Sequence, residues 1–463
     1  MTLAKHVFFL GLGGIGMSAL ARHLHRIGHV VGGYDLSPSP LLDRLRGEGI
    51  WVGHSENVDN LPEWTNPNVH EALTLVWTPA IPADFPLKRH FESQGIQAVK
   101  RAELLGAITQ DHPTLAVAGT HGKTTTSSWL ADMLMAQPAG CHAFLGGIDA
   151  ASGTNMLTKP GASWHVVEAD EFDRSFHQLH PTHAAVTNMD PDHLDVFGTE
   201  EAFQEAFQIF GNQVTQTLIL PHNLPWPTTK NLERFAVVDG GDDVPDRLDH
   251  LATVQAGARD VAFELHRNDP FRTCSFVAAP AMAGRHNTAN ALVAAALASH
   301  ANVGAEVLAQ RVAHFGGVRR RMEVHLDTPE VTYIDDYAHH PSELSALLSA
   351  IDSRWPNRHV TMVFQPHLYS RTRDFGVEFA KVLGQVDRLF LLPIYPAREA
   401  PIPGVDAQWL FDNISSPDKH LVASDSIFTS LKACPVDVLV TAGAGDIDRL
   451  VPQALQHMQD RRK

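Results

Sequence analysis

The segment Gly119–Thr126, which reads GTHGKTTT, contains the residue types that bind a nucleoside triphosphate. It follows the apolar run Leu115–Ala118 and precedes the helix-like stretch Ser127–Met135. In such a loop, backbone amides surround the phosphates, Lys123 reaches the terminal ones, and a threonine hydroxyl can hold Mg²⁺. The spacing departs from the strict phosphate-loop pattern, because Val117 stands where the first glycine is usual. Strand, loop and helix in this order predict an ATP site. Its candidate contacts are Gly119, Thr120, His121, Gly122, Lys123, Thr124 and Thr125.

A second glycine-rich loop, Gly11–Ser18, reads GLGGIGMS and follows the apolar run that ends at Leu10. Glycines at this spacing allow a tight turn in which backbone N–H groups approach a phosphate at a helix N-terminus. Asp35 ends the next strand-like run, where an acid would bind a ribose. The loop predicts a nucleotide or nucleotide-sugar site. Taken alone, the loop indicates an NAD site of a dehydrogenase. The non-functional alternative is a glycine turn that allows only close packing. The candidate contacts are Gly11, Gly13, Gly14, Ile15, Gly16, Met17 and Asp35.

Acidic residues and a histidine follow two later apolar runs. Glu168–Glu171 reads EADE after one run, and Asn188–Asp195 reads NMDPDHLD after the next. Because the carboxyl ends of parallel strands share one edge of a sheet, both segments should lie beside the phosphate loop. A carboxylate there can hold a divalent metal over the phosphates, whereas an imidazole such as His193 is an unusual ligand for Mg²⁺. Some of these acids could cap helices instead, namely Asp170, Asp173 and Asp195.

A helix-like stretch near residue 290 begins with Gly284–Asn290, GRHNTAN. Asn287 and Asn290 are three residues apart, so they share one face of a helix. Amides on that face could contact adenine or ribose. By itself the segment is more typical of an ordinary capped helix start than of a ligand contact.

Two polar segments lie nearer the C-terminus. Arg319–Arg321 precedes Asp335–Pro341, which reads DDYAHHP where a strand gives way to a helix. Phe364–Thr372, FQPHLYSRT, follows another strand-like run, and its Arg371 is a candidate clamp for a carboxylate or phosphate. Without further information, the arginines could simply be solvated, and the Asp-Asp and His-His pairs could imitate a metal site.

The elements that must position these segments alternate regularly along the chain. Short β-branched or aromatic runs such as Val7–Leu10, Val30–Asp35 and Thr114–Gly119 alternate with helix-like stretches, which is the pattern of parallel α/β domains. For 463 residues, a prior of about 150 residues per domain predicts roughly three domains. We expect boundaries near residues 108 and 314, which divide the chain into domains 1–107, 108–313 and 314–463.

Composition narrows the class of protein. The chain has 52 acidic and 36 basic residues, and the net charge of −16 disfavours non-specific binding to nucleic acid or an anionic membrane. Its three cysteines contain no CxxC pair, which excludes a disulfide framework or a cysteine zinc site and fits a reducing compartment. The apolar stretch Val7–Leu20 imitates a signal peptide, but it contains the glycines of the loop. We therefore expect a cytoplasmic protein.

In this order the motifs resemble those of the Mur ligase family, from about residue 5 to residue 450. The most specific pieces are Gly119–Thr126, Glu168–Glu171 with Asp192 and His193, and Asp335–Pro341. The resemblance implies three domains: a Rossmann-like domain for the UDP part of the substrate, a central P-loop ATPase-type domain, and a Rossmann-like C-terminal domain for the amino acid. A dehydrogenase would leave the Lys-Thr-Thr segment and the Glu168–His193 pair unexplained.

The resemblance also implies a reaction. ATP would convert the carboxylate of UDP-N-acetylmuramate into an acyl phosphate, and L-alanine would attack it to form an amide in peptidoglycan precursor synthesis. The segments GLGGIGMS, FQPHLYSRT and LLPIYPARE favour alanine as the second substrate. The alternative is a recycling ligase that joins UDP-N-acetylmuramate to a tripeptide, and selectivity among L-alanine, glycine and L-serine stays open. We expect a monomer or weak homodimer.

Residue roles follow from the resemblance by position. Lys123 would stabilise the transferring phosphate, and Thr124, Glu168 and His193 would hold Mg²⁺. Other residues implied to act on ATP are Asn287, Asn290, Arg321 and Asp336, while those implied to face the amino acid or acyl phosphate are His340 and Arg371. Two departures are visible: Leu368 stands where the family commonly has arginine, and no lysine occurs between Lys159 and Lys230 that could be carbamylated.

Overall fold

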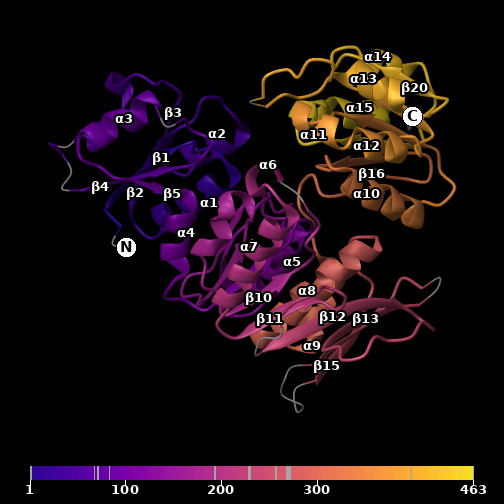
Figure 1. Cartoon of the computed structure of the whole chain (residues 1–463), viewed down its shortest axis with the longest axis horizontal. Helices are drawn as coiled ribbons and strands as arrows, with labels where there is room; N and C mark the ends of the chain where they lie inside the picture. Colours follow the sequence, from indigo (N-terminus) through magenta and orange to yellow (C-terminus); the bar gives the residue numbers. More distant parts are fainter. Residues whose placement is uncertain are drawn as a thin grey trace. The chain divides into compact units, whose positions relative to one another are not determined.

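The computed structural model describes residues 3–66, 68–69, 72–82, 84–191, 194–227, 231–255, 258–266, 273–397 and 399–461, with only the backbone of residues 194 and 195. The chain divides into two compact units. The first comprises Met1–Pro280 with Ala289–Gly316, and the second Ala281–Thr288 with Gly317–Lys463. Three separate β-sheets with helices between their strands confirm the expected α/β class (Figure 1). The first unit contains two of these sheets and the second contains one.

The N-terminal sheet is parallel, with strand order β3-β2-β1-β4-β5. Its strands are β1 (His6–Leu10), β2 (Val30–Tyr34), β3 (Trp51–Gly53), β4 (Leu73–Trp77) and β5 (Ala98–Lys100). The helices are α1 (Ile15–Arg26), α2 (Pro40–Gly47), α3 (Pro86–Ser93) and α4 (Arg101–Thr109). The direction of strand succession reverses at β1, and in open α/β sheets such a switch point forms a crevice at the carboxyl ends of the strands. The glycine loop that follows β1 lies at this point.

The central sheet has ten strands, in the order β15-β14-β13-β12-β11-β10-β6-β9-β7-β8. They are β6 (Thr114–Ala118), β7 (Cys141–Phe144), β8 (Met156–Thr158), β9 (Trp164–Glu168), β10 (His183–Val186), β11 (Thr217–Pro221), β12 (Leu232–Asp239), β13 (His250–Val254), β14 (Val261–His266) and β15 (Thr273–Ala278). The strands from β13 to β7 are parallel, and the outer strands β14, β15 and β8 are antiparallel. All five residues of β6 are buried, as expected for a parallel strand covered on both faces.

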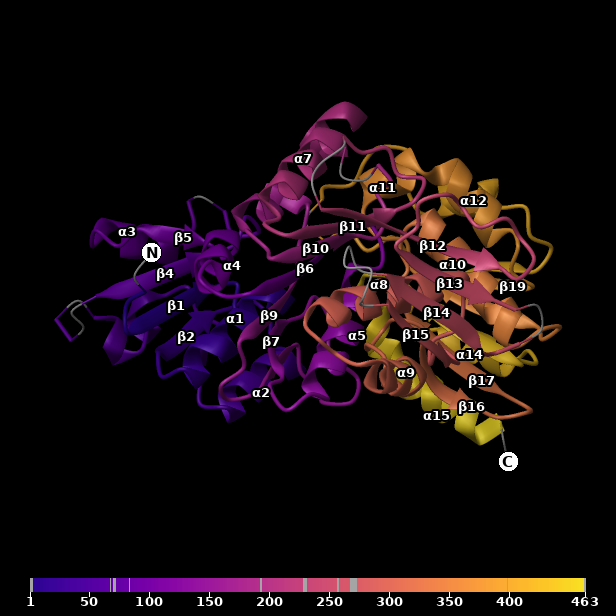
Figure 2. The ribbon, with the colours of Figure 1, turned by 90° about the horizontal axis from the view of Figure 1, so that it is seen from below.

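Helices cover the two faces of the central sheet. They are α5 (Lys123–Met135), α6 (Leu194–Phe197), α7 (Glu200–Gln213), α8 (Arg285–His300) and α9 (Ala305–His314). Figure 2 shows α7 on one side of β10 and β11, and α5 with α9 on the other side of the sheet. Opposite placement of α5 and α7 follows from right-handed crossovers. The chain moves in one direction across the sheet from β6 through α5 to β7, and in the other direction from β10 through α7 to β11.

The sheet of the second unit has strand order β16-β17-β21-β18-β19-β20, and only the edge strand β16 is antiparallel. Its strands are β16 (Glu323–Asp327), β17 (Thr332–Asp336), β18 (Val360–Phe364), β19 (Arg388–Leu391), β20 (Lys419–Leu421) and β21 (Val438–Ala442). Its helices are α10 (Pro341–Arg354), α11 (Tyr369–Asp374), α12 (Gly376–Leu383), α13 (Ala407–Asn413), α14 (Ile427–Lys432) and α15 (Val451–Arg461). Among the helices of the described ranges, none is both long and apolar enough to cross a membrane.

Candidate active site

The phosphate loop connects β6 to α5 within the first unit. Gly119 and Gly122 have φ angles of +128° and +82°, which residues other than glycine rarely adopt. A Cβ on Gly119 would lie 2.1 Å from the hydroxyl oxygen of Thr187, so this position also excludes a side chain by contact. The His121 amide donates to Asn188 Oδ1 at 3.0 Å, and Asn188 Nδ2 donates back to the His121 carbonyl at 3.0 Å. The end of β10 therefore holds the loop in shape.

The N-terminus of α5 is available to an anion. The first N–H groups of a helix have no partners within the helix, and here no described side chain caps them. The helix dipole adds a partial positive charge at the same point. Asn290 lies directly beside the loop: a Cβ on Gly122 would be 2.5 Å from Asn290 Oδ1, which also accepts a hydrogen bond from Thr126 Oγ1 at 3.1 Å.

Lys123 is the first residue of α5 and forms an ion pair that the sequence analysis did not assign. Its Nζ donates to the carbonyl of Gly119 at 2.6 Å and to Glu171 Oε1 at 2.9 Å. Burial raises the pKa of Glu171 to about 7, although the charge of Lys123 acts in the opposite direction. Burial alone would lower the pKa of Lys123, but the carboxylate of Glu171 and its acidic neighbours raise it. Lys123 is therefore held at the loop as a cation.

Thr124 and Glu168 bring two oxygen donors together beside the loop. Thr124 Oγ1 donates to Glu168 Oε2 at 2.9 Å. Glu168 ends β9, which pairs with β6 so that Glu168 lies opposite Val117. A Cβ on Gly146 would lie 2.0 Å from Glu168 Oε2, so the carboxylate fits only because residue 146 has no side chain. A hydroxyl and a carboxylate are the kind of donors that Mg²⁺ takes. His193, the third expected ligand, lies outside the described residues.

The neighbouring acids contact the N-terminal domain, and Asp170 Oδ1 also accepts a hydrogen bond, at 3.2 Å, from the first amide of the 3₁₀-helix Phe172–Gln178, as a helix cap does. The side chain of Asp195 lies outside the described residues. Asp170 Oδ2 accepts a hydrogen bond from Arg101 Nη2 at 3.2 Å, and Asp173 pairs with Lys100 at 3.0 Å. Arg101 is also close to the first glycine loop, since a Cβ on Gly16 would be 3.0 Å from Arg101 Nη1. Sequence reasoning missed Arg101, because a single arginine at the start of a helix has no distinguishing pattern. The structure places its charge between the first glycine loop and Asp170.

The first glycine loop turns between β1 and α1 as expected. The amides of Gly11 and Leu12 both donate to the Tyr34 carbonyl, at 2.8 and 2.9 Å, and Gly11 has a φ of +86°. The Gly13 amide donates to Asp35 Oδ2 at 2.8 Å. One carboxylate oxygen of Asp35 therefore already holds the loop, so its contact with a ribose remains a prediction.

Helix α1, which begins with Ile15 and includes the buried Met17, is anchored to the central domain. Asn155, in the turn before β8, donates from Nδ2 to the Ile15 carbonyl and, at 2.9 Å, to Ser18 Oγ. Its Oδ1 accepts a hydrogen bond from Arg22 Nη1. The same arginine pairs with Glu48 at 2.9 Å. The loop that would bind the nucleotide sugar is thus coupled to the domain that would bind ATP.

In the second unit, Asp336 ends β17 and is buried. Burial raises the pKa of Asp336 to about 6, and the charge of Arg321 opposes that rise. The Asp336 carboxylate accepts hydrogen bonds from the amides of Met322 and Ala338, at 2.5 and 2.7 Å. Arg321 stacks over the ring of Tyr337 at 5.2 Å and lies 3.8 Å from Glu343. This unit therefore brings the expected pair Arg321 and Asp336 together.

His340 has a structural role as the cap of α10. Its Nδ1 accepts a hydrogen bond from the Ser342 amide at 3.4 Å, and its own amide donates to Glu343 Oε2 at 3.2 Å. Its ring packs against Phe375, with the centroids 4.5 Å apart. Asn287 is also engaged, because its Nδ2 donates to the Ala283 carbonyl at 2.8 Å. The ligand contacts expected of His340 and Asn287 stay predictions.

Arg371 lies on α11, the short helix that starts after Leu368. Leu368 has a φ of +70°, and its amide donates to the Tyr395 carbonyl at 2.9 Å. Ser370 Oγ and its amide both donate to Glu399, the amide at 3.0 Å. The two segments FQPHLYSRT and LLPIYPARE are therefore hydrogen-bonded to each other at the residues on either side of Tyr369. Leu368, where the resemblance predicts an arginine, thus has a positive φ that residues other than glycine rarely adopt.

Comparisons with known proteins agree along the whole chain. Three family models match: the Mur ligase family catalytic domain at 6–113, the Mur ligase middle domain at 117–298, and the Mur ligase glutamate ligase domain at 320–447. The chain is 42% identical to a UDP-N-acetylmuramate–L-alanine ligase of Porphyromonas gingivalis over 98% of this chain and 99% of that protein. It is 41% identical to one of Flavobacterium johnsoniae over 97% and 96%.

Two solved structures share the fold. A UDP-N-acetylmuramate-alanine ligase from Thermotoga maritima gives a TM-score of 0.80 at 22% identity, covering 98% of this chain and 99% of the other. A murein peptide ligase from Psychrobacter arcticus gives 0.70 at 22% identity, covering 98% of each chain. At this level of identity the likeness concerns the fold alone, and it confirms the three-domain α/β architecture.

Proposed function

The chain belongs to the Mur ligase family, and we propose that it joins L-alanine to the carboxylate of UDP-N-acetylmuramate with hydrolysis of ATP to ADP and phosphate. The observation that carries the ATP part is the site at the start of α5, where Lys123, Thr124 and Glu168 meet. The identity of the two other substrates is supported by relatives about 40% identical along nearly the whole chain. Because these substrates are intracellular metabolites, we place the reaction in the cytoplasm.

The proposed reaction has two steps. A carboxylate oxygen of UDP-N-acetylmuramate attacks the γ-phosphorus of ATP, the bond to the β-phosphate oxygen breaks, and an acyl phosphate and ADP form. The amine of L-alanine then attacks the acyl carbon, inorganic phosphate leaves, and the amine loses a proton. Phosphoryl transfer depends mainly on positioning and on cancelling negative charge.

The residues around the phosphate loop are suited to that task. We propose that the amides at the start of α5 and the ammonium of Lys123 bind the phosphates, so that the incoming phosphate competes with Glu171 for Lys123. Thr124 and Glu168, with His193, would hold Mg²⁺, which supplies further positive charge to the phosphates when bound. Asn290 borders the loop and would contact the nucleoside, as would Asn287, Arg321 and Asp336.

The N-terminal domain would bind the nucleotide sugar. Its glycine loop lies at the switch point of the sheet, where the amides of Gly11–Gly16 can approach a diphosphate. Arg101, beside Gly16 and Asp170, would bind an anionic group of the same substrate. In the second unit, we assign His340 and Arg371 to the amino acid or the acyl phosphate.

A phosphate-release assay tests this proposal. The purified chain is given ATP, Mg²⁺ and UDP-N-acetylmuramate, with L-alanine, glycine, L-serine or a murein tripeptide added in turn. We expect release that requires the nucleotide sugar and is fastest with L-alanine. A preference for the tripeptide would instead assign the chain to peptide recycling. Tight binding of NADH, without any thermal shift on adding UDP-N-acetylmuramate, would refute the ligase function.

A further inference from the structure

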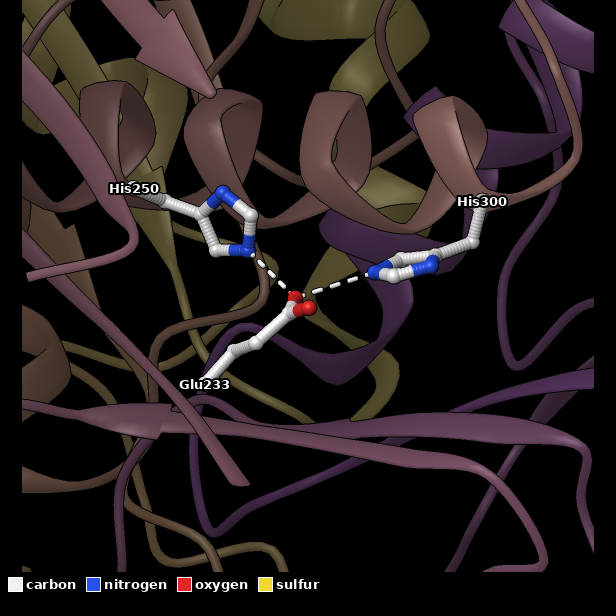
Figure 3. Close-up of side chains that lie close together, drawn as sticks. All are labelled: Glu233, His250 and His300. Carbon is white, nitrogen blue, oxygen red and sulfur yellow. Dashed lines mark hydrogen bonds and ion pairs between the residues drawn. The ribbon is translucent and has the colours of Figure 1, made fainter. Parts of the chain in front are cut away.

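A cluster of two histidines and a glutamate lies within the central domain, and none of its three residues takes part in the proposed reaction (Figure 3). Glu233 comes from β12, His250 from β13, and His300 is the last residue of α8. His250 Nε2 is 2.7 Å from Glu233 Oε2, and His300 Nε2 is 2.9 Å from the same oxygen. His300 is ten residues beyond Asn290 on α8, which is about 15 Å along the helix from the residue that borders the phosphate loop.

The Glu233 carboxylate is buried between the two imidazoles. Glu233 and His250 are both fully buried, and His300 is nearly so. Burial would raise the pKa of Glu233, but the hydrogen bonds from His250 and His300 outweigh it and lower the pKa to about 2. An ionised carboxylate away from water is costly unless a cation accompanies it. Within the described residues, only the two histidines contact the Glu233 carboxylate.

Two buried polar atoms of the cluster lack partners. Glu233 Oε1 and His250 Nδ1 have no hydrogen-bond partner among the described residues. An unpaired buried acceptor costs free energy that native proteins usually avoid. A cation bound by both carboxylate oxygens would give Glu233 Oε1 a partner. Such a cation would have two ligand atoms from Glu233 and one from each imidazole.

We propose that Glu233, His250 and His300 form a structural binding site for one zinc ion. Two imidazole nitrogens and a carboxylate are ligands that Zn²⁺ takes, and the second carboxylate oxygen completes four-coordination. Zinc bonds of 2.0–2.1 Å place ligand atoms about 3.3 Å apart. From the observed 2.7 and 2.9 Å, each imidazole needs to move outward by only about half an ångström. When the ion binds Nε2 of a neutral imidazole, the ring proton moves to Nδ1, so no proton leaves and the ion adds its two positive charges beside the buried carboxylate.

A second cluster in the chain provides the control. Glu323, His325 and Asp335 also place three donor atoms within 4.8 Å of one another. There, however, Arg320 already accompanies the carboxylate of Asp335, with Nε 3.1 Å from Oδ2. This cluster needs no added cation, so His325→Gln should leave zinc binding unchanged.

The experiment measures zinc on the full chain by mass spectrometry after dialysis against a chelator, and then by calorimetric titration. We expect one tightly bound zinc in the wild type and in His325→Gln, with affinity lowered at least about 100-fold in His250→Gln and His300→Gln. Zinc should raise the melting temperature of the wild type but not of these two variants, because a buried ion is coupled to folding. Unchanged zinc affinity in both variants, or no tight site in the wild type, would overturn the proposal.

A measurement on the wild type alone covers the case in which the two variants do not fold. Co²⁺ in place of zinc gives intense visible absorption when it is four-coordinate and weak absorption when it is six-coordinate. We expect the intense spectrum at one equivalent, displaced by zinc. A weak spectrum, as from cobalt on surface histidines, would contradict a buried four-coordinate site.

Discussion

Lys123→Met removes the ammonium from the phosphate loop while keeping a side chain of similar length. In the structure the Lys123 ammonium lies 2.6 Å from the Gly119 carbonyl, which places it at the loop itself. A positioned group that cancels charge in a transition state stabilises it by about 3–4 kcal/mol, and we expect a fully charged group such as the Lys123 ammonium to lie at the upper end of that range. We therefore expect the rate of phosphate release to fall at least ~10³-fold, which corresponds to about 4 kcal/mol.

The same variant leaves Glu171 buried without its cation, and this has a measurable pH dependence. Glu171 has a pKa of about 7 in the folded chain against an ordinary 4.5. Between these values the folded state keeps a proton that the unfolded chain releases, so stability falls with rising pH by about 1.4 kcal/mol per unit. In the wild type this loss ends near pH 7. Without Lys123 the pKa of Glu171 rises further, so the variant should lose about a further 1 kcal/mol between pH 7 and 8.

The assay combines phosphate release with thermal melting at pH 6, 7 and 8. Lys159→Met is the matched control, because Lys159 is a partly buried lysine of the same domain whose Nζ donates to the Gln137 carbonyl at 2.8 Å. We expect the control to keep its turnover and to follow the wild type in stability at each pH. Near-normal turnover in Lys123→Met would show that ATP binds elsewhere. Equal loss of stability above pH 7 in both variants would refute the pairing of Lys123 with Glu171.

Four further substitutions test other parts of the site. Glu168→Gln should raise the Mg²⁺ concentration for half-maximal rate by at least about tenfold, since it removes a ligand charge but keeps the shape; an unchanged Mg²⁺ curve would exclude Glu168 as a ligand. His193→Ala should also weaken the dependence on Mg²⁺, and an unaltered requirement would leave His193 with a structural role. Asp35→Asn should abolish the rise in melting temperature caused by UDP-N-acetylmuramate, and a full rise would show that Asp35 only shapes the loop. Arg101→Met should raise KM for UDP-N-acetylmuramate about tenfold while KM for ATP stays constant, and equal changes in both would indicate a general loss of structure.

Much of the fold could be predicted from the sequence, because buried parallel strands appear as continuous apolar runs. The runs Val7–Leu10, Val30–Asp35 and Thr114–Gly119 correspond to β1, β2 and β6 within one or two residues. Strands β12 to β15 were not among the expected ones. They lie toward one end of the central sheet, where β14 alternates buried with more exposed residues and most of β15 alternates exposed with partly buried ones. Such short alternating runs are difficult to distinguish from polar loops.

The phosphate loop was predictable for a local reason. Glycines that adopt positive φ, the lysine and the threonine all lie within eight consecutive residues, Gly119–Thr126. The backbone conformation and the chemistry are therefore specified by one short segment. Pairing of β6 with β9 then brings Glu168 to Thr124, and this too follows from the rule that parallel strands end at one edge.

The partners of these residues depended on the tertiary structure. Glu171 was visible in the EADE motif, yet only the folded loop shows that it pairs with Lys123. His250 lies opposite Phe235 in the register of β12 and β13, which puts it on the same face of the sheet as Glu233, two residues earlier. His300 reaches the same carboxylate from the end of α8, 67 residues from Glu233 in sequence. The sequence alone determined the fold class and the local phosphate loop, because a few consecutive residues specify each strand and turn. Only the tertiary structure decided which distant charges meet, because strand register and helix packing, rather than local spacing, bring them together.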